Sequence, residues 1–375
     1  METTIAMRKF FPFAVLVLGA VVSTVNAQQP APSAPGAAAP QAAPFTAANK
    51  ASAVELLAQR LSAKYVFADG GDKMAAEVRG HLRKGDYDKV GTRAEFAELL
   101  TAHLHAAVPD RHLLVRFMPQ GAMPDRPRPK LTEAPPPEML KRMKEVGKYW
   151  NFAFEKVERL PGNVMYVKVD SFFGADLAKP VVTAAMNFAA SGDAMIIDLR
   201  ENGSGDPRTV AYMASYLLGD KKVHLSDIVF RADKETDAFW SDPSVPGAHF
   251  GPSKPVYVLT SDKTFSAAED FTYNLQALKR VIVVGDTSKG GAHPAAPFRI
   301  DPYMVAIIPA GRTVNPITKG NWEGTGVKPD VAIAADKALT KAHALALQAL
   351  LPQVNDPEDR PILQQKLEEL QAALK

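Results

Sequence analysis

Residues 256–271 read VYVLTSDKTFSAAEDF and are the most informative segment of the sequence. Residues 256–260 form an apolar run of strand length, and a polar turn follows. A helix is predicted to begin close to Ser266, because serine and threonine are favoured at helix N-caps. The backbone N–H groups at a helix start are unpaired and carry partial positive charge. Ser266 or Thr264 can therefore merely cap the helix, or Ser266 can present its hydroxyl to an anion-stabilising site with the N–H of Ala267 as donor.

Strand-like runs and helical stretches alternate on both sides of this junction. The predicted strands cover residues 164–169, 194–199, 255–260, 281–284 and 305–308. The predicted helices cover residues 178–190, 207–218, 266–279 and 337–374. Strands that alternate with helices are typical of an α/β core. We place this core at residues 149–352 and a C-terminal helix at residues 353–375.

A second strand–turn junction, residues 196–206, reads IIDLRENGSGD. Its glycines favour a turn that exposes backbone N–H groups and lets another backbone approach closely. An ordinary loop between a strand and a helix is the alternative reading of this segment.

The residues before the core are predicted to form a small helical unit. Apolar residues recur at helical spacing through residues 46–107, and Thr92 with Glu95 makes a capping box. We place an N-terminal helical domain at residues 46–117 and a Pro-rich linker with a short helix from Glu138 at residues 118–148.

The N-terminus has the pattern of a signal peptide. Arg8 and Lys9 precede an apolar run at residues 10–22, which is shorter than the about 20 residues that a membrane span needs. Small residues at Val25 and Ala27 fit a cleavage site after residue 27. We therefore expect residues 1–27 to be removed and the protein to be exported, to the periplasm or outside the cell. Residues 28–45 are a Pro/Ala-rich linker, and no later stretch of the mature chain predicts a membrane span.

Composition excludes several classes of chemistry. The 375 residues contain no cysteine, which rules out disulfides, thiolate metal sites and cysteine nucleophiles. The 44 basic and 41 acidic residues give a net charge of +3 without a clustered basic stripe, so we expect no nucleic-acid partner. Neither a GxGxxG nor a Walker motif is present, and we expect no cofactor. His103 and His105 lie on different faces of a helix and no HExxH occurs, so we expect no catalytic metal.

Four ordered elements give the sequence a family resemblance. They are residues 196–206, the Ser-Ala-x-Glu element within residues 264–269, Val-Val-Gly-Asp at 283–286 and Trp-Glu-Gly-Thr-Gly-Val-Lys-Pro-Asp at 322–330. At this spacing they resemble the S41 serine peptidases, the C-terminal-processing and tricorn-core family. The resemblance covers about residues 45–350. It implies a ClpP/crotonase-like α/β core with a small N-terminal helical bundle.

Two departures from the processing-protease pattern make the chain resemble one particular branch of that family. In the processing-protease branch a lysine follows the serine by 25 residues, and this chain has Gly291 at that position. The gap at residues 117–150 is also too short for the PDZ domain of that branch. Both features resemble the branch of the interphotoreceptor retinoid-binding-protein repeats and the tricorn core. Ser204 stands where the family usually has glycine, within the loop that would form the oxyanion hole.

A serine hydroxyl needs a base to take its proton. His112 lies in an Asp-x-His element, residues 110–112, that resembles the family's base. The resemblance implies the following site: Ser266 as nucleophile, His112 as general base, Glu323 as the orienting acid, and the N–H groups of Ala267 and Gly205 as oxyanion hole. His293 and Lys289 remain alternative bases. A histidine base with an ordinary pKa predicts activity that rises through about pH 6 to 7.

We therefore interpret the chain as a serine peptidase that hydrolyses peptide bonds through an acyl-enzyme. Two alternatives remain open. An esterase could use the same serine, and a non-catalytic protein could use the scaffold to bind a lipophilic ligand or peptide. Glu269, one helical turn after Ser266, would support the site or form a surface ion pair.

Overall fold

The computed structural model describes residues 45–126 and 135–375. The predicted signal peptide, the linker up to residue 44 and residues 127–134 of the Pro-rich segment lie outside the described residues. In the described part of the chain, no helix is both long and apolar enough to cross a membrane.

A six-stranded sheet forms the centre of the molecule, with the order β12-β8-β7-β4-β3-β2. Its strands are β2 (Phe154–Leu160), β3 (Val164–Val169), β4 (Ala194–Asp198), β7 (Val256–Thr260), β8 (Ile282–Gly285) and β12 (Val331–Ala332). All neighbours pair in parallel except β2 and β3. Four of the five predicted strands lie in this sheet, and the fifth lies in β10 (Met304–Pro309).

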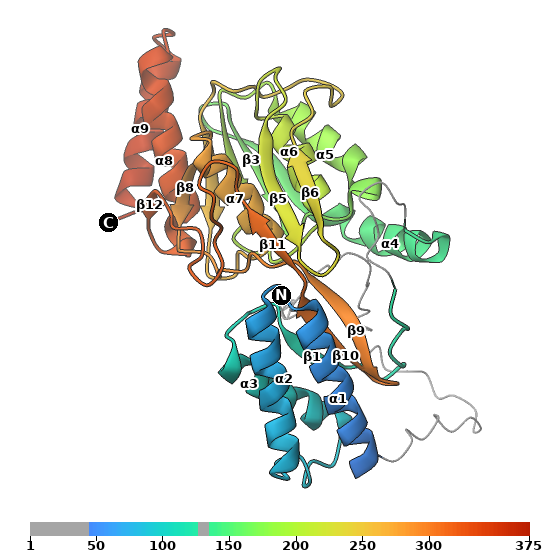
Figure 1. The fold of residues 1–375 in the computed structure, drawn as a ribbon. Helices are drawn as coiled ribbons and strands as arrows, with labels where there is room; N and C mark the ends of the chain where they lie inside the picture. The colour runs from blue at the N-terminus through green and yellow to red at the C-terminus, as the bar shows by residue number, and fades with distance from the viewer. Residues whose placement is uncertain (1–44, 127–134) are drawn as a thin grey trace, which may run out of the picture.

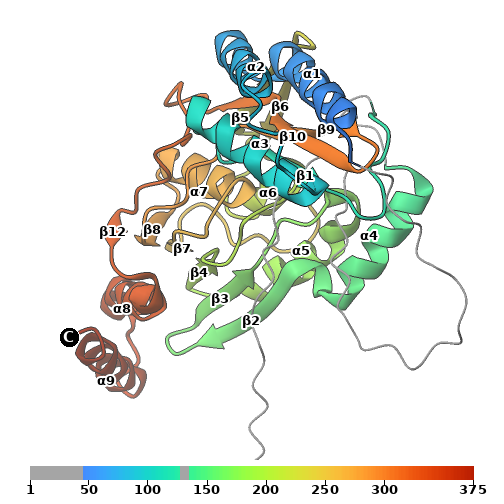
Figure 2. The same ribbon diagram turned by 90° about the horizontal axis from the view of Figure 1, so that it is seen from below.

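Helices cover both faces of this sheet (Figure 2). One layer contains α5 (Ala175–Ala189), α6 (Pro207–Ser215) and α7 (Ala267–Ala277), and the other contains α8 (Ala338–Leu350) and α9 (Asp359–Ala372). Successive side chains of a strand point to opposite faces, so Ile197 packs in the cluster of α5–α7 and Ile196 in the cluster of α8. The predicted α/β core is confirmed. The predicted helix at 337–374 is interrupted around Pro352 and Pro357, because proline breaks helical hydrogen bonding.

The N-terminal helices pack on a β-hairpin that belongs to the C-terminal half of the chain (Figure 1). The helices are α1 (Ala47–Lys64), α2 (Ala68–Arg83) and α3 (Arg93–Ala107), and the predicted capping box at Thr92 is confirmed. The hairpin consists of β9 (Ala295–Asp301) and β10, and β1 (Leu114–Phe117) pairs with β10. Met304 and Ile308 of β10 lie in one apolar cluster with Leu57 and Phe96. Residues 46–117 therefore share their core with residues 295–309.

A third, smaller sheet lies against the helical layer of α5–α7. It has the order β11-β5-β6, with β5 (His224–Phe230), β6 (Glu235–Trp240) and β11 (Gly311–Val314). The remaining elements are α4 (Pro137–Tyr149), which packs on α5, and the 3₁₀ turns η1 (Asn151–Ala153), η2 (Ala335–Lys337) and η3 (Leu351–Gln353). Because β11 follows β10 directly, the hairpin and this sheet meet next to the N-terminus of α7 (Figure 1).

Candidate active site

Ser266 is the N-cap residue of α7 and has a strained backbone. Its φ of 58° and ψ of −116° lie in a region that residues with a side chain rarely occupy. The turn before it is held by Thr264, whose hydroxyl donates to the Leu199 carbonyl at 2.8 Å. The Phe265 N–H donates to the Asn202 carbonyl at 3.0 Å. The loops after β4 and β7 are thus joined, and this junction fixes the position of the serine.

Glu269 connects the serine turn to a second loop. Its carboxylate accepts hydrogen bonds from the Ser266 N–H at 2.9 Å and from the Gly290 and Gly291 N–H groups at 2.6 and 2.9 Å. The Ser288 hydroxyl donates to it at 2.5 Å. Burial raises the pKa of Glu269 to about 7, and these four donors oppose the rise. Glu269 is fully buried, so it does not form the surface ion pair that the sequence left open.

Two backbone N–H groups next to Ser266 are available to a ligand. In the described part of the chain, neither the Ala267 N–H nor the Gly205 N–H donates a hydrogen bond. Gly205 is required at its position, because a Cβ there would stand 2.3 Å from the Cβ of Phe172. Ser204, unusual for the family, is buried, and its hydroxyl lies 3.0 Å from that of Ser171. The loop is therefore fixed on both sides of Gly205.

His112 is buried with both ring nitrogens unpaired among the described residues. Its ring stacks on Phe265 with the centroids 4.4 Å apart. Its backbone N–H donates to Asp110 Oδ1 at 3.0 Å. Burial lowers the pKa of the His112 imidazole to about 4, against the charge of Asp110, which raises it. The ring is therefore neutral at pH 7 and able to accept a proton.

One cleft brings four of the five predicted site residues together. Ser266, His112, Ala267 and Gly205 line a cleft of about 60 Å³. The other residues that line it are Pro207, Ile228, Asp270, Gly291, Ala292, Pro294, Ala295, Thr313 and Trp322. The helical unit contributes His112, which lies between α3 and β1, and the α/β core contributes Ser266, Ala267 and Gly205.

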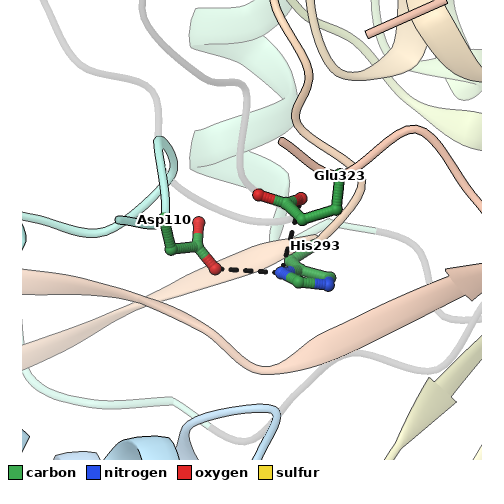
Figure 3. Close-up of side chains that lie close together, drawn as sticks. All are labelled: Asp110, His293 and Glu323. Carbon is green, nitrogen blue, oxygen red and sulfur yellow. Dashed lines mark hydrogen bonds and ion pairs between the residues drawn. The ribbon is translucent and has the colours of Figure 1, made fainter. Parts of the chain in front are cut away.

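Glu323 contacts His293 rather than His112 (Figure 3). Its Oε2 accepts a hydrogen bond from the Ala292 N–H at 2.6 Å and lies 3.4 Å from His293 Nδ1. His293 Nδ1 lies 2.9 Å from Asp110 Oδ2, which also accepts a hydrogen bond from the Tyr65 hydroxyl at 3.1 Å. Asp110 therefore links the loop of His112 to the loop of His293 and, through it, to Glu323. Among the described residues, Glu323 has no hydrogen bond to His112.

The electrostatics of this cluster follow from its burial and its single histidine. Burial raises the pKa of Glu323, and the charge of Asp110 adds to the rise. Burial acts in the same direction on Asp110, but the hydrogen bond and charge of His293, together with the charge and backbone N–H of His112, outweigh it and lower the pKa of Asp110. Asp110 is thus the carboxylate that remains ionised most readily beside His293.

Asp110, His293 and Glu323 are also residue types that bind metals. Their ligand atoms all lie within 4.8 Å of one another. The nearest oxygens already accept hydrogen bonds, Asp110 Oδ2 from Tyr65 and Glu323 Oε2 from Ala292. The contact of 2.9 Å between His293 and Asp110 has hydrogen-bond length, so this arrangement is that of a hydrogen-bonded network.

The alternative bases, His293 and Lys289, do not line the cleft of Ser266. His293 lines a second hollow, together with Phe67, Arg312 and Glu323. Lys289 is exposed, and its Nζ lies 5.2 Å from the centroid of the Phe265 ring. Glu269 is the residue whose place in the site the sequence left undecided. The Ser-x-x-Glu spacing was the available signal, but its contacts with Gly290 and Gly291 depend on the tertiary fold.

A strained serine at a helix N-cap, with an imidazole and free N–H groups in the same cleft, is the arrangement of a serine peptidase. Two family models match the chain. The model described as peptidase family S41 matches residues 163–333. The model described as the N-terminal domain of peptidase S41 in eukaryotic IRBP matches residues 45–158. The chain belongs to peptidase family S41.

Solved structures share the fold at low sequence identity. A putative peptidase from Parabacteroides merdae is 18% identical with a TM-score of 0.51, covering 82% of this chain and 97% of that one. A mutant of CPAF is 10% identical with a TM-score of 0.56, covering 83% and 98%. A lipoprotein from Streptococcus agalactiae is 12% identical with a TM-score of 0.51, covering 80% and 96%. At these identities the likeness concerns the fold alone.

Proposed function

We propose that this protein hydrolyses peptide bonds through an acyl-enzyme formed on Ser266. The observation that carries the proposal is that Ser266 and the unpaired, buried ring of His112 line one cleft. In the first step a ring nitrogen of His112 takes the hydroxyl proton as Ser266 Oγ attacks the substrate carbonyl. The proton then passes to the leaving amine, and water hydrolyses the ester by the same route.

The N–H groups of Ala267 and Gly205 would stabilise the oxyanion of each tetrahedral intermediate. Both line the cleft and neither has an acceptor in the described part of the chain. The start of α7 adds partial positive charge at the same point. Removal of one such donor from a comparable site typically lowers kcat by about 100- to 1,000-fold.

The orientation of His112 depends on packing in this proposal. The Phe265 ring lies against one side of the imidazole, and Asp110 holds the backbone of His112. Glu323 contacts His293, and His293 contacts Asp110, so Glu323 has no direct contact with the base. Phe265, Asp110, His293 and Glu323 thereby connect the loop of His112 to the core. In this proposal, packing fixes the position of the imidazole ring, and no carboxylate is needed at its free nitrogen.

Labelling with a fluorophosphonate tests this proposal without knowledge of the substrate. We expect wild-type protein to be labelled on Ser266, and Ser266→Ala and His112→Ala to lose the label. Ser253→Ala, a change at an exposed serine, is the matched control and should label normally. Unlabelled wild-type protein, or a label at another serine, would refute the proposed nucleophile.

Binding of an apolar ligand without catalysis is a second candidate function. The apolar side chains in the cleft, among them Ile228 and Trp322, favour it. Such a protein would bind a lipophilic probe with equal affinity before and after Ser266→Ala and would not react with the fluorophosphonate. An esterase would react but would hydrolyse ester substrates and leave matched amides intact.

We also propose that the protein is exported after cleavage behind Ala27. The support is the order of charged, apolar and small residues in residues 1–27. N-terminal sequencing of the protein from its native host should give Gln28 as the first residue. A mature chain that begins at Met1 would refute export by this route.

A further inference from the structure

Asp270 is a buried carboxylate in the wall of the cleft. It lies in the first turns of α7, four residues after Ser266, and its residue is 6% exposed. Among the described residues that line the cleft, it is the only acidic one. Four residues of helix correspond to about 6 Å along the axis, so the carboxylate lies one helical turn beyond the nucleophile.

The charge of Asp270 is incompletely compensated within the protein. Its Oδ1 accepts a hydrogen bond from the Asn274 amide at 2.7 Å, and Asn315 donates in turn to Asn274 at 2.8 Å. In the part of the chain that the structure describes, Asp270 forms no ion pair. Burial raises the pKa of its carboxyl to about 6, and the hydrogen bond of Asn274 opposes this rise. An ionised carboxylate buried without a cation is unfavourable, so a cation supplied from outside would stabilise it.

A second buried polar group, the Ser226 hydroxyl, lies near Asp270. The Ser226 hydroxyl, on β5, is near enough to lower the pKa of Asp270. The hydroxyl makes no hydrogen bond of acceptable geometry within the described residues. A buried hydroxyl without a partner is unusual in a folded protein, so the surroundings of the Asp270 carboxylate are incompletely hydrogen-bonded.

The other walls of the cleft limit what such a ligand can be. They are formed by apolar side chains: Ile228, Pro294, Ala295 and Trp322. Apolar walls suit a hydrocarbon stem, and the carboxylate of Asp270 suits a positive charge. The best match is an ammonium or guanidinium group carried on an apolar stem.

We propose that Asp270 forms a subsite for a cationic group of the substrate, next to the scissile bond. The inference rests on the proposed serine peptidase function and specifies its substrate class. The cation has two possible sources, the side chain of lysine or arginine, or the N-terminal ammonium group of a short peptide. Asp270 would contact this cation from the wall of the cleft.

Cleavage of paired peptides tests the subsite. Each pair is identical except for lysine or its uncharged analogue norleucine beside the scissile bond. We expect wild-type protein to favour lysine by about 10- to 150-fold in kcat/KM, the range of hydrogen bonds to charged groups. Asp270→Asn, which keeps the shape of the side chain, should abolish the preference. Asp336→Asn, the same charge change at an exposed site, should retain it.

Two further experiments extend this test. The first distinguishes the two sources of the cation, and the second detects the subsite without substrate turnover. Norleucine peptides with a free or an acetylated N-terminus are also compared: acetylation lowers their kcat/KM only if the substrate N-terminus supplies the cation. Butylammonium should slow fluorophosphonate labelling of wild-type Ser266 more than butanol does, and should not do so in Asp270→Asn.

The outcomes distinguish this inference from the function on which it rests. Active wild-type protein that cleaves lysine and norleucine peptides equally, and free and N-acetylated peptides equally, overturns the subsite and leaves the peptidase proposal intact. The same holds if Asp270→Asn keeps the lysine preference. Wild-type protein that neither reacts with the fluorophosphonate nor cleaves any peptide overturns both.

Discussion

His112 Cε1 lies 2.7 Å from the point at which a Cβ on Gly291 would stand. Two ring atoms of Phe265 lie at 2.2 and 2.5 Å from the same point. All three atoms belong to ring side chains in a packed environment, so they cannot move aside at low cost. Residue 291 must therefore be glycine for the imidazole to occupy its place. No side chain can therefore occupy the position at which the processing-protease branch has its lysine. The His112 ring fills this space.

Gly291→Ala should disrupt catalysis through the position of His112. We expect at least a tenfold loss in the rate of fluorophosphonate labelling and a destabilisation of about 1–3 kcal/mol, as for an overpacked core. Gly80→Ala is the matched control, because a Cβ there meets no atom within 4 Å. That change lies in α2 and should stabilise the protein by about 0.5–1 kcal/mol. Normal labelling of Gly291→Ala would contradict the proposed role of the ring.

Ser266 should show a conflict between stability and function. Ser266→Ala is expected to abolish turnover and to remain folded, because little is lost when a half-buried hydroxyl is removed. Ser266→Gly should also be inactive, but more stable than Ser266→Ala by about 1 kcal/mol, since glycine tolerates a φ of 58°. Denaturant unfolding of the two variants measures the difference. Equal stabilities would argue against backbone strain at the nucleophile, and residual turnover in either variant would exclude Ser266 as its source.

His112→Ala should lower kcat by at least about 100-fold, the lower end of general-base contributions. Lys289→Ala should cost much less, because that side chain is exposed and lies outside the cleft. A larger loss from Lys289→Ala than from His112→Ala would reverse the assignment of the base.

The pH dependence of His112 follows from its lowered pKa. The base must be neutral, so its contribution to kcat/KM should rise through about pH 4 rather than through pH 6 to 7. Between pH 4 and about 6.5 the unfolded chain binds more protons at this residue than the folded chain does, so the stability contribution of His112 falls as the pH decreases through that window. NMR titration of the imidazole reports this group alone. A midpoint near 6.5 in the folded protein would contradict the proposed environment.

Glu269→Gln should loosen the serine turn. All four hydrogen-bonding partners of the carboxylate are donors, so the amide NH₂ of glutamine would face two of them without an acceptor. We expect a loss of at least about 2 kcal/mol in the free energy of unfolding and slower labelling of Ser266. Glu98→Gln, at an exposed position of α3, should change neither quantity. Unchanged labelling of Glu269→Gln would show that the turn is held by other contacts.

The parts of the fold that were predicted from the sequence are those with local patterns. The strand at residues 164–169 was predicted with its observed bounds, because its apolar run reflects burial on both faces. β5 and β6 were not predicted, since strands such as 235–240 mix exposed polar residues with few apolar ones. The pairing of β1 with β10 joins segments far apart in the chain, and no local pattern reports it.

The same distinction applies to the site. Ser266, Ala267 and Gly205 were identified because each lies in a strand–turn junction that the sequence displays directly. The partner of Glu323 depends on which histidine the fold brings to it, and both His112 and His293 were available in the sequence. Asp270 gave no sequence signal, because only tertiary packing turns that face of α7 toward the cleft.

The hairpin of β9 and β10 has a consequence for the order in which the chain becomes active. Leu114 pairs with Ile307, so the segment that contains His112 obtains its strand partner only after four fifths of the polypeptide has been synthesised. Contacts this distant in sequence form late, because the entropy of closing the loop opposes them. Under the proposed mechanism, a nascent chain lacks the base beside Ser266 until this pairing forms, and activity would therefore be confined to completed molecules.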